Sequence, residues 1–234
     1  MSKSFQIAID GPVAAGKGTV SRLLAQKLGF LYVDTGAMYR ATALLALRQE
    51  IDLADEDQVV ALLKKSKLEM RNPIPPKELD GRLTTVILDG EDVSWAIRTQ
   101  KCGDGSSKVA VLPKLRHVLV QKQQEIAANQ NVVMEGRDIT FRVLPDADLK
   151  IFLTADVKSR ATRRHMQYLT KGVDTTIEKV IEEIKERDKR DMQRDTDPLQ
   201  IMPDAWVLDT SNLEIEEVVD LIIEKVEQIK KKND

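Results

Sequence analysis

The sequence feature that most constrains the fold is a glycine-rich loop near the start of the chain. Residues 11–19 read GPVAAGKGT, follow the apolar run FQIAID and open directly into a helical pattern. The G-x-x-x-x-G-K spacing lets successive backbone N–H groups curl around an anion, and the helix N-terminus adds positive dipole. The sequence therefore predicts a strand, a phosphate-binding loop and a helix, with Lys17 reaching the outer phosphates.

The loop departs from the strict form of the motif at one position. Gly18 follows the lysine where many such loops carry Ser or Thr, and Thr19 comes one residue later. Because Mg²⁺ gives up its waters reluctantly, we expect nucleotide phosphates and water to bind it, without a dedicated set of protein ligands. The residues predicted to hold the nucleotide cofactor here are Gly11, Pro12, Val13, Ala14, Ala15, Gly16, Lys17, Gly18 and Thr19.

The apolar period alternates along most of the chain between strand-like and helix-like segments. Such alternation is typical of a parallel sheet with helices on both faces, and we predict an α/β fold with a five-stranded parallel sheet of the P-loop NTPase type. The predicted strands are 5–10, 31–34, 131–135, 149–154 and 205–209. The predicted helices are 17–28, 35–48, 109–128, 157–170, 175–192 and 214–232.

One stretch breaks this alternation. Short β-like runs flank Asp89-Gly90, a dipeptide that favours a tight hairpin turn, and the proline-rich run 72–76 precedes them. We interpret residues 52–97 as a small inserted α+β unit, which leaves 1–51 and 98–234 for the core.

Charge and composition exclude several classes of function. The chain has 36 Lys and Arg against 38 Asp and Glu, a net charge of −2, which does not suit a sequence-independent nucleic-acid binder. A single cysteine and two histidines provide neither an internal disulfide nor a multi-cysteine zinc site. Without a long apolar stretch or a signal-like start, we expect a cytoplasmic monomer that binds neither membrane nor nucleic acid. Any anionic ligand must be held by a local cationic cluster.

Candidate cations follow the predicted strands. Arg40 follows the second strand, and Arg137-Asp138 follows the third, at the sheet edge where open α/β folds bind ligands. Arg187, Asp191 and Arg194 are spaced i, i+4 and i+7, which would place them on one helical stripe. Each pattern also has an interpretation without a binding role. Arg40 could be a surface arginine, Arg137-Asp138 a local ion pair, and the stripe at 187–194 a solvated helix face.

Taken together, the motifs resemble a known family. The segments IAIDGPVAAGKGTV, VDTGAMYR, IRTQ, GRDI, PDADLKIFL and IKERDKRDMQRD occur in an order and at intervals similar to bacterial cytidylate (CMP) kinases, within the nucleoside monophosphate kinases. The resemblance spans Ile7 to Asp220. It implies a core, a monophosphate-binding insert at 52–97, a lid at about 158–174, and the reaction of ATP with CMP or dCMP to give ADP and CDP or dCDP.

The resemblance also implies roles for individual residues. The acceptor-binding positions would be Thr35, Arg40, Ser107, Arg116, Arg137, Asp138, Arg187, Asp191 and Arg194, with Ser107, Arg116 and Asp138 reading the cytosine. Arg160 and Arg164 of the lid would contact ATP phosphates, with Arg163 an alternative. The catalytic set would be Lys17, Arg137, Arg187 and Arg194, with ATP as co-substrate and Mg²⁺ as cofactor.

Two segments depart from the family pattern, and both lie beside the expected base pocket. Ile139–Arg142 reads ITFR, where the family has Gly-Thr and two apolar residues after the first apolar position. Lys101–Ser106 is more polar and richer in glycine than the corresponding family run. The choice of base is therefore the least constrained part of the interpretation.

The chemistry of phosphoryl transfer agrees with the absence of an obvious His–carboxylate catalytic pair. A phosphate acceptor is largely dianionic at pH 7, so it needs no general base. Two alternatives stay open: a P-loop kinase for UMP, AMP or a non-nucleotide alcohol, for which Asp34 or Asp138 could act as base, and a nucleotide-binding regulator. The sequence lacks the N-K-x-D motif of switch GTPases.

Overall fold

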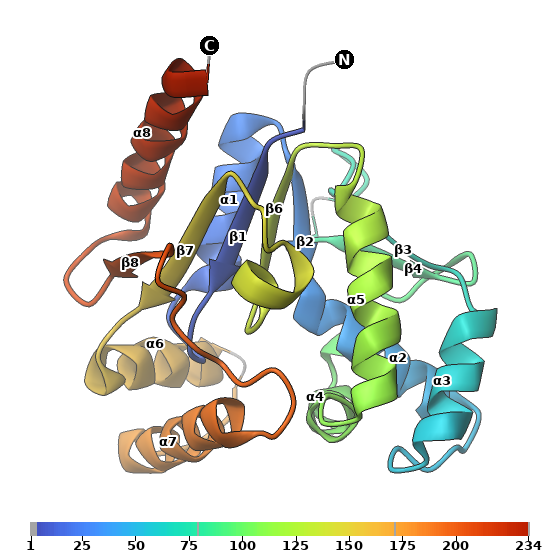
Figure 1. The fold of residues 1–234 in the computed structure, drawn as a ribbon. Helices are drawn as coiled ribbons and strands as arrows, with labels where there is room; N and C mark the ends of the chain where they lie inside the picture. Colours follow the sequence, from blue (N-terminus) through green and yellow to red (C-terminus); the bar gives the residue numbers. More distant parts are fainter. Residues whose placement is uncertain (1–3, 79, 171, 234) are drawn as a thin grey trace.

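The computed structural model describes residues 4–78, 80–170 and 172–233, so Leu79 of the expected insert and Lys171 of the expected lid lie outside the described residues. Five strands form one parallel sheet in the order β2-β6-β1-β7-β8, which confirms the predicted fold class (Figure 1). The strands are β1 (Gln6–Asp10), β2 (Leu31–Asp34), β6 (Val132–Gly136), β7 (Leu149–Thr154) and β8 (Trp206–Asp209).

Helices cover both faces of this sheet, and the alternating side chains of each strand divide the core in two. Ile7 and Ile9 of β1 pack with α1 (Lys17–Leu28) and α8 (Ile215–Asn233), whereas Ala8 between them faces the opposite layer. That layer contains α2 (Thr35–Arg48), α4 (Gln100–Val109), α5 (Pro113–Ala127) and the short helix η2 (Ile139–Val143). The two-residue period of the strands thus produces both halves of the core.

Two further helices lie beyond the carboxyl ends of the strands. They are α6 (Val157–Thr170) and α7 (Ile177–Gln193), which pack on each other through a small apolar cluster. Figure 1 shows both below the sheet, where the strand arrows end. In the described residues, no helix is long and apolar enough to cross a membrane.

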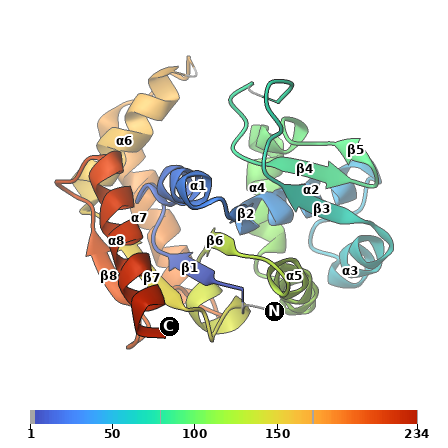
Figure 2. The same cartoon turned by 90° about the horizontal axis from the view of Figure 1, so that it is seen from above.

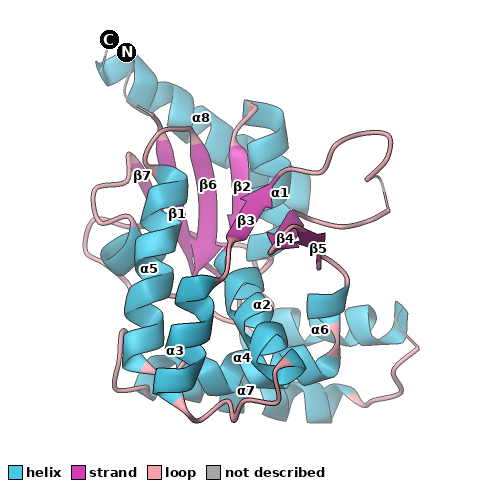
Figure 3. Ribbon diagram, turned by 90° about the vertical axis from the view of Figure 1, so that its right-hand side faces the viewer, coloured by secondary structure: helices cyan, strands magenta, loops and turns pink. Residues whose placement is uncertain are grey.

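The segment 52–97 forms a helix and a small antiparallel sheet. Its elements are α3 (Glu56–Lys65), β3 (Leu68–Arg71), β4 (Thr85–Leu88), β5 (Glu91–Asp92) and the 3₁₀-helix η1 (Ala96–Arg98). Asp89 and Gly90 both have positive φ, 51° and 85°, between β4 and β5, so the predicted hairpin turn is confirmed. Figure 2 shows this small sheet on the opposite side of the molecule from α8, and Figure 3 shows it beside β2 and α1.

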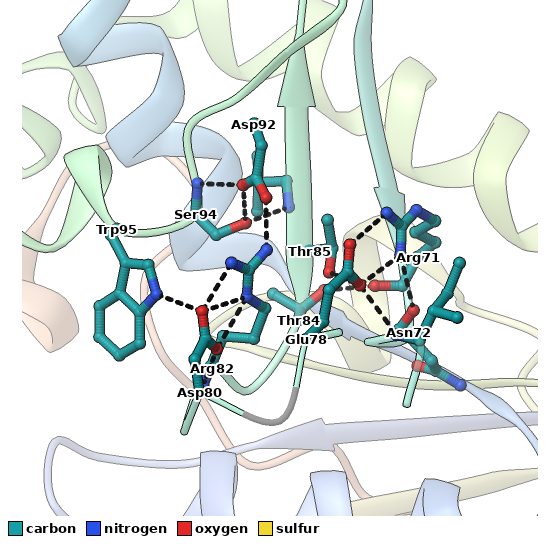
Figure 4. A network of polar contacts seen from close by, with 12 residues as sticks. Arg71, Asn72, Glu78, Asp80, Arg82, Thr84, Thr85, Asp92, Ser94 and Trp95 are labelled. Carbon is teal, nitrogen blue, oxygen red and sulfur yellow. Dashed lines mark hydrogen bonds and ion pairs between the residues drawn. The ribbon is translucent and has the colours of Figure 1, made fainter. Parts of the chain in front are cut away.

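Ion pairs hold the long loop between β3 and β4 in place. Arg82 bonds Asp80 at 2.6 Å and also reaches Asp92 beyond β4, while the Trp95 indole donates to Asp80 at 2.8 Å (Figure 4). At the start of the loop, the Asn72 side chain pairs with the backbone at Phe30 and Tyr32, which ties the insert to β2. These bonds hold the described residues on both sides of position 79.

Several local predictions are wrong. The expected helix over 109–128 starts later, at Pro113, and ends at Ala127, because Pro113 has no N–H to donate and favours the first turn of a helix. The preceding helix, α4, was not predicted, since its two glycines weaken the helical signal. Arg194 is the C-cap residue of α7, with φ −66° and ψ 145°, so the helix ends one residue before it; Arg187, Asp191 and Arg194 nevertheless line the same cleft.

Candidate active site

A cleft of about 350 Å³ opens at the carboxyl ends of β1, β2 and β6. The phosphate-binding loop forms one wall, α2 and α4 another, and α6 and α7 close the third side. Most of the residues predicted from the sequence line this one cleft: Ala14, Gly16, Lys17, Gly18, Thr19, Thr35, Arg40, Ser107, Arg116, Arg137, Asp138, Arg164, Arg187, Asp191 and Arg194. Six separate parts of the chain, at 14–19, 35–40, 107–116, 137–138, 164 and 187–194, thus meet at the predicted sheet edge.

The phosphate-binding loop is shaped by two glycines and one arginine. A Cβ on Gly11 would lie 2.0 Å from the Leu153 carbonyl oxygen, so only glycine fits there, and Gly16 has the left-handed φ of 93°. Arg160 is buried behind the loop, where its Nη1 donates to the Val13 carbonyl at 3.1 Å and to Asp188 at 2.7 Å. Arg160 therefore braces the loop rather than facing the cleft.

Lys17 begins α1 and is nearly buried. Its Nζ donates to the Gly11 and Pro12 carbonyls at 2.9 Å and 2.8 Å. Burial, followed by the nearby Arg137, lowers the pKa of Lys17 from 10.5 to about 7. The unfolded chain then binds the extra proton between about pH 7 and 10.5, so Lys17 makes the protein more stable as the pH rises through that range.

The low pKa of Lys17 predicts that binding of a nucleoside triphosphate takes up protons. Near pH 8 the free protein holds Lys17 largely neutral, and bound phosphates restore its charge, so we expect about one proton to be taken up per nucleotide, with ATP as the ligand used in the test. Titration calorimetry at pH 8 in two buffers with different ionisation enthalpies measures the uptake directly. Lys17→Met is the control and should abolish it; equal heats for the wild type in both buffers would refute the prediction.

A buried acid lies directly beside the loop. Glu135, at the end of β6, accepts a 2.9 Å hydrogen bond from the Tyr32 hydroxyl, and burial raises its pKa. A Cβ on Gly18 would lie 3.1 Å from Glu135 Oε1 and 3.5 Å from the Tyr32 hydroxyl. A Ser or Thr side chain at position 18 would therefore crowd this pair, and Glu135 would have to shift by a few tenths of an ångström.

Arginines from three elements converge on the opposite side of the cleft. Arg137, just after β6, donates from Nε to Asp191 of α7 at 2.7 Å, and Arg40 of α2 donates to Asp34 at 2.8 Å. Desolvation by the surrounding protein, followed by repulsion from Arg137, lowers the pKa of Arg187 to about 10, although Arg187 is partly open to solvent. Arg137 and Arg40 both repel the charge of Arg187, and an anion bound between these cations would offset that repulsion.

A second polar group lies deeper, between α2 and α5. Arg116 is 2% exposed and its Nη2 bonds the Asp138 carboxylate, while burial raises the pKa of Asp138. The Tyr39 ring lies 6.0 Å from the Arg116 guanidinium carbon, and Ser107 of α4 also lines the cleft. An acceptor carboxylate and a donor guanidinium are thus paired at the inner end of the cleft.

Some predicted residues do not line the cleft, and some that line it were missed. Five predicted residues do not line the cleft. Four of them belong to the phosphate-binding loop itself, Gly11, Pro12, Val13 and Ala15, and the fifth, Arg160, supports the loop from behind. The cleft also contains Asp34, Gly36, Tyr39, Leu83, Arg98, Ser106, Ala110, Val111, Glu135, Gly136, Gln167 and Arg190, which the predicted site did not include. Two of these residues could have been found from the motifs: Arg98 belongs to IRTQ, and Glu135 directly precedes GRD. Asp34 caps α2 by accepting from the Ala37 N–H, and Thr35 donates to the Glu135 carbonyl at 2.8 Å.

Comparison with known proteins agrees with this geometry. The family model described as "Cytidylate kinase" matches residues 7–228. The chain belongs to the cytidylate kinase family. Curated cytidylate kinases of Bacillus thuringiensis and Bacillus cereus are each 45% identical to it over 224 residues, which cover 95% of this chain and 96% of theirs. The resemblance drawn from the motifs is confirmed, and the chain is a nucleoside monophosphate kinase, a phosphotransferase.

A solved structure supports the fold alone. The crystal structure of an uncharacterized protein from Eubacterium ventriosum superposes with a TM-score of 0.51 at 12% identity, covering 96% of this chain and 99% of that one. At this identity the likeness concerns the arrangement of the elements and carries nothing about substrate.

Proposed function

We propose that this member of the cytidylate kinase family transfers the γ-phosphoryl group of ATP to CMP or dCMP, giving ADP and CDP or dCDP. The observation that carries the proposal is one cleft with two phosphate-holding groups and an inner donor–acceptor pair. The phosphate-binding loop with Lys17 would hold ATP, and Arg40, Arg137, Arg187 and Arg194 would hold the acceptor phosphate.

The inner pair suits cytosine. The edge of cytosine offers an N4 amino donor next to the N3 acceptor. Uracil presents the opposite pattern at the same two positions, an O4 acceptor next to an N3–H donor. Ionised Asp138 accepts and Arg116 donates, so the pair complements cytosine. Ser107, whose hydroxyl is 3.5 Å from the Gly103 carbonyl, would add a further polar contact.

The transfer itself needs alignment and charge neutralisation. The acceptor phosphate is already largely dianionic near pH 7, so no general base is required. Lys17 and the loop N–H groups would neutralise the charge on the donor side, and Arg137, Arg187 and Arg194 would neutralise the charge that spreads over the transferred group.

The residues of the cleft also suit Mg²⁺ held largely through water. In the described residues no three His, Cys, Asp or Glu side chains gather as a metal site. However, the Glu135 and Asp34 carboxylates and the Thr19 hydroxyl line the cleft beside Lys17, and these are the oxygen donors that Mg²⁺ prefers. When bound, the ion would supply charge neutralisation on the ATP phosphates.

We further propose the division of the chain suggested by the sequence: a core at 1–51 and 98–234, an insert at 52–97 and a lid at about 158–174. Arg164 and Gln167 of α6 line the cleft, which supports the lid assignment. We expect the kinase to be a cytoplasmic monomer; gel filtration with light scattering checks the oligomeric state.

A panel of acceptors tests the proposed activity. ADP release in the presence of ATP and Mg²⁺ is measured with CMP, dCMP, UMP, AMP and a sugar alcohol. We expect kcat/KM for CMP and dCMP to exceed the other values by about 100-fold, because the wrong edge leaves buried polar groups unpaired. Strong turnover of another acceptor without turnover of CMP would refute the substrate, and ATP binding without any transfer would refute the activity.

A further inference from the structure

Asp197, four residues beyond the end of α7, connects the two ends of the proposed acceptor site. Its side-chain Oδ2 accepts hydrogen bonds from Arg116 Nε at 3.2 Å and Nη2 at 3.1 Å. Its backbone carbonyl accepts from Arg194 Nε at 2.8 Å and also from Arg194 Nη2. One residue thus holds an arginine of the inner pair and an arginine of the phosphate cluster.

The backbone of Asp197 has an unusual conformation that separates these two contacts. Its φ is 47°, in the left-handed region that costs most side chains energy and that Asp and Asn tolerate best. Held this way, the carbonyl bonds one arginine while the carboxylate bonds another. Two residues further on, the Leu199 N–H donates to the Asp191 carbonyl at 2.8 Å, which fixes the turn to the end of α7.

The bonds to Asp197 decide which part of Arg116 is left for a ligand. A guanidinium has five N–H donors. Asp197 takes one on Nε and one on Nη2, Asp138 takes the second on Nη2, and the Ala110 carbonyl takes one on Nη1 at 3.2 Å. Within the part of the chain that the structure describes, one Nη1 donor is left. The same bonds also prevent the guanidinium from turning about its axis.

Arg142 adds a third cation to Asp197. It comes from η2, in the segment ITFR that departs from the family pattern, and its Nε lies 3.6 Å from Asp197 Oδ1. The Arg142 side chain is half exposed, so water weakens this pair compared with the buried contact to Arg116. Arg142 therefore balances charge at Asp197 but does not set its position.

We propose that Asp197 is a positioning residue for the acceptor nucleotide: it holds Arg116 and Arg194 at a fixed separation, so that base and phosphate are recognised together. The inference rests on the proposed function. Asp197 contacts the arginines and not the reacting atoms, so its loss should weaken acceptor binding and base discrimination more than the chemical step.

The decisive experiment is Asp197→Asn, with Asp197→Gly as its companion. Both substitutions suit a φ of 47° and keep the carbonyl bonds to Arg194, but both remove the charge that holds Arg116. We expect KM for CMP to rise about tenfold or more and the CMP-over-UMP preference in kcat/KM to fall about tenfold, because charge-assisted hydrogen bonds to Arg116 are lost. KM for ATP should stay within twofold.

Controls separate positioning from general destabilisation. Two substitutions at exposed residues near Asp197 serve as controls, Asp195→Asn and Arg142→Gln. Each should change KM for CMP by less than about twofold. Asp197→Glu, which restores the charge, should recover part of the preference. If Asp197→Asn unfolds at a much lower temperature than the wild type, KM for CMP and the CMP-over-UMP preference are measured on Asp197→Gly instead.

The outcomes can be told apart. Unchanged KM for CMP and unchanged CMP-over-UMP preference in the Asp197 variants would overturn the inference, as would parallel losses for CMP and ATP. If the wild type instead uses another acceptor, the proposed function fails. The inference would then be judged on that acceptor, where a selective rise in its KM supports Asp197 and an unchanged KM rejects it.

Discussion

Lys17→Ala is expected to lower kcat by about three orders of magnitude and to leave the fold intact, since preorganised charge on a transferring phosphoryl group supplies a large part of the rate. Lys17 begins α1 and lines the cleft, and its Nζ is held by the carbonyls of Gly11 and Pro12. No other described lysine lines this cleft. Water in the space left by alanine would carry no positive charge to the phosphates.

The measurement is kcat from ADP release at saturating ATP and CMP, together with a thermal unfolding curve. Burial lowers the pKa of Lys17, which shows that its charge is costly in the folded chain without nucleotide, so Lys17→Ala should unfold at the same or a higher temperature. Lys27→Ala, in the exposed last turn of the same helix, is the matched control and should keep full activity. Near-normal turnover by Lys17→Ala would contradict the mechanism.

The sheet and its covering helices could be predicted because the local signals and the tertiary structure agree. The helix of residues 17–28 was predicted with its observed bounds, since it starts at the lysine of the loop and ends at Gly29, which has a left-handed φ of 68°. The five strands were found because buried parallel strands are short apolar runs between helices. In these segments the secondary structure follows from the local sequence pattern and does not depend on a contact between particular residues far apart in the chain.

The parts that could not be predicted depend on contacts between distant residues. Glu135 reads as the end of a strand, and only the fold places it beside Tyr32 and Gly18. Arg160 was predicted to face ATP, but the helix turns it toward the back of the phosphate-binding loop. Asp197 gives no signal in a charge-rich run, because its contacts with Arg116 join residues 81 positions apart.

A net charge of −2 is compatible with this strongly cationic cleft because several of its arginines have an acid as partner. Asp34 pairs with Arg40, Asp191 with Arg137, and Asp138 with Arg116. These carboxylates keep the cations in place without phosphate, and they lower the net attraction for long polyanions. A small dianion that enters the cleft would compete with them for the guanidinium donors.

Arg137 is the arginine whose loss should affect transfer most. It follows β6 directly, where a Cβ on Gly136 would lie 2.7 Å from Thr35 Oγ1, so the close approach of α2 fixes the backbone that carries it. Its Nε is engaged by Asp191 and one Nη1 donor by the Gly136 carbonyl, which leaves the rest of the fork for phosphate oxygens. We expect Arg137→Ala to lower kcat by about 100- to 1,000-fold.

Arg137→Lys separates charge from geometry. Lysine keeps the positive charge but lacks the planar fork that can bond Asp191 and a phosphate at once, so it should recover less than about a tenth of the lost rate. Asp191→Asn removes the partner while keeping the arginine; if Arg137 acted only by supporting α7, this substitution would cost as much kcat as Arg137→Ala. Lys189→Ala, at an exposed residue of the same helix that does not line the cleft, should leave kcat unchanged. Full recovery by Arg137→Lys would show that a point charge suffices and that the fork plays no part in transfer.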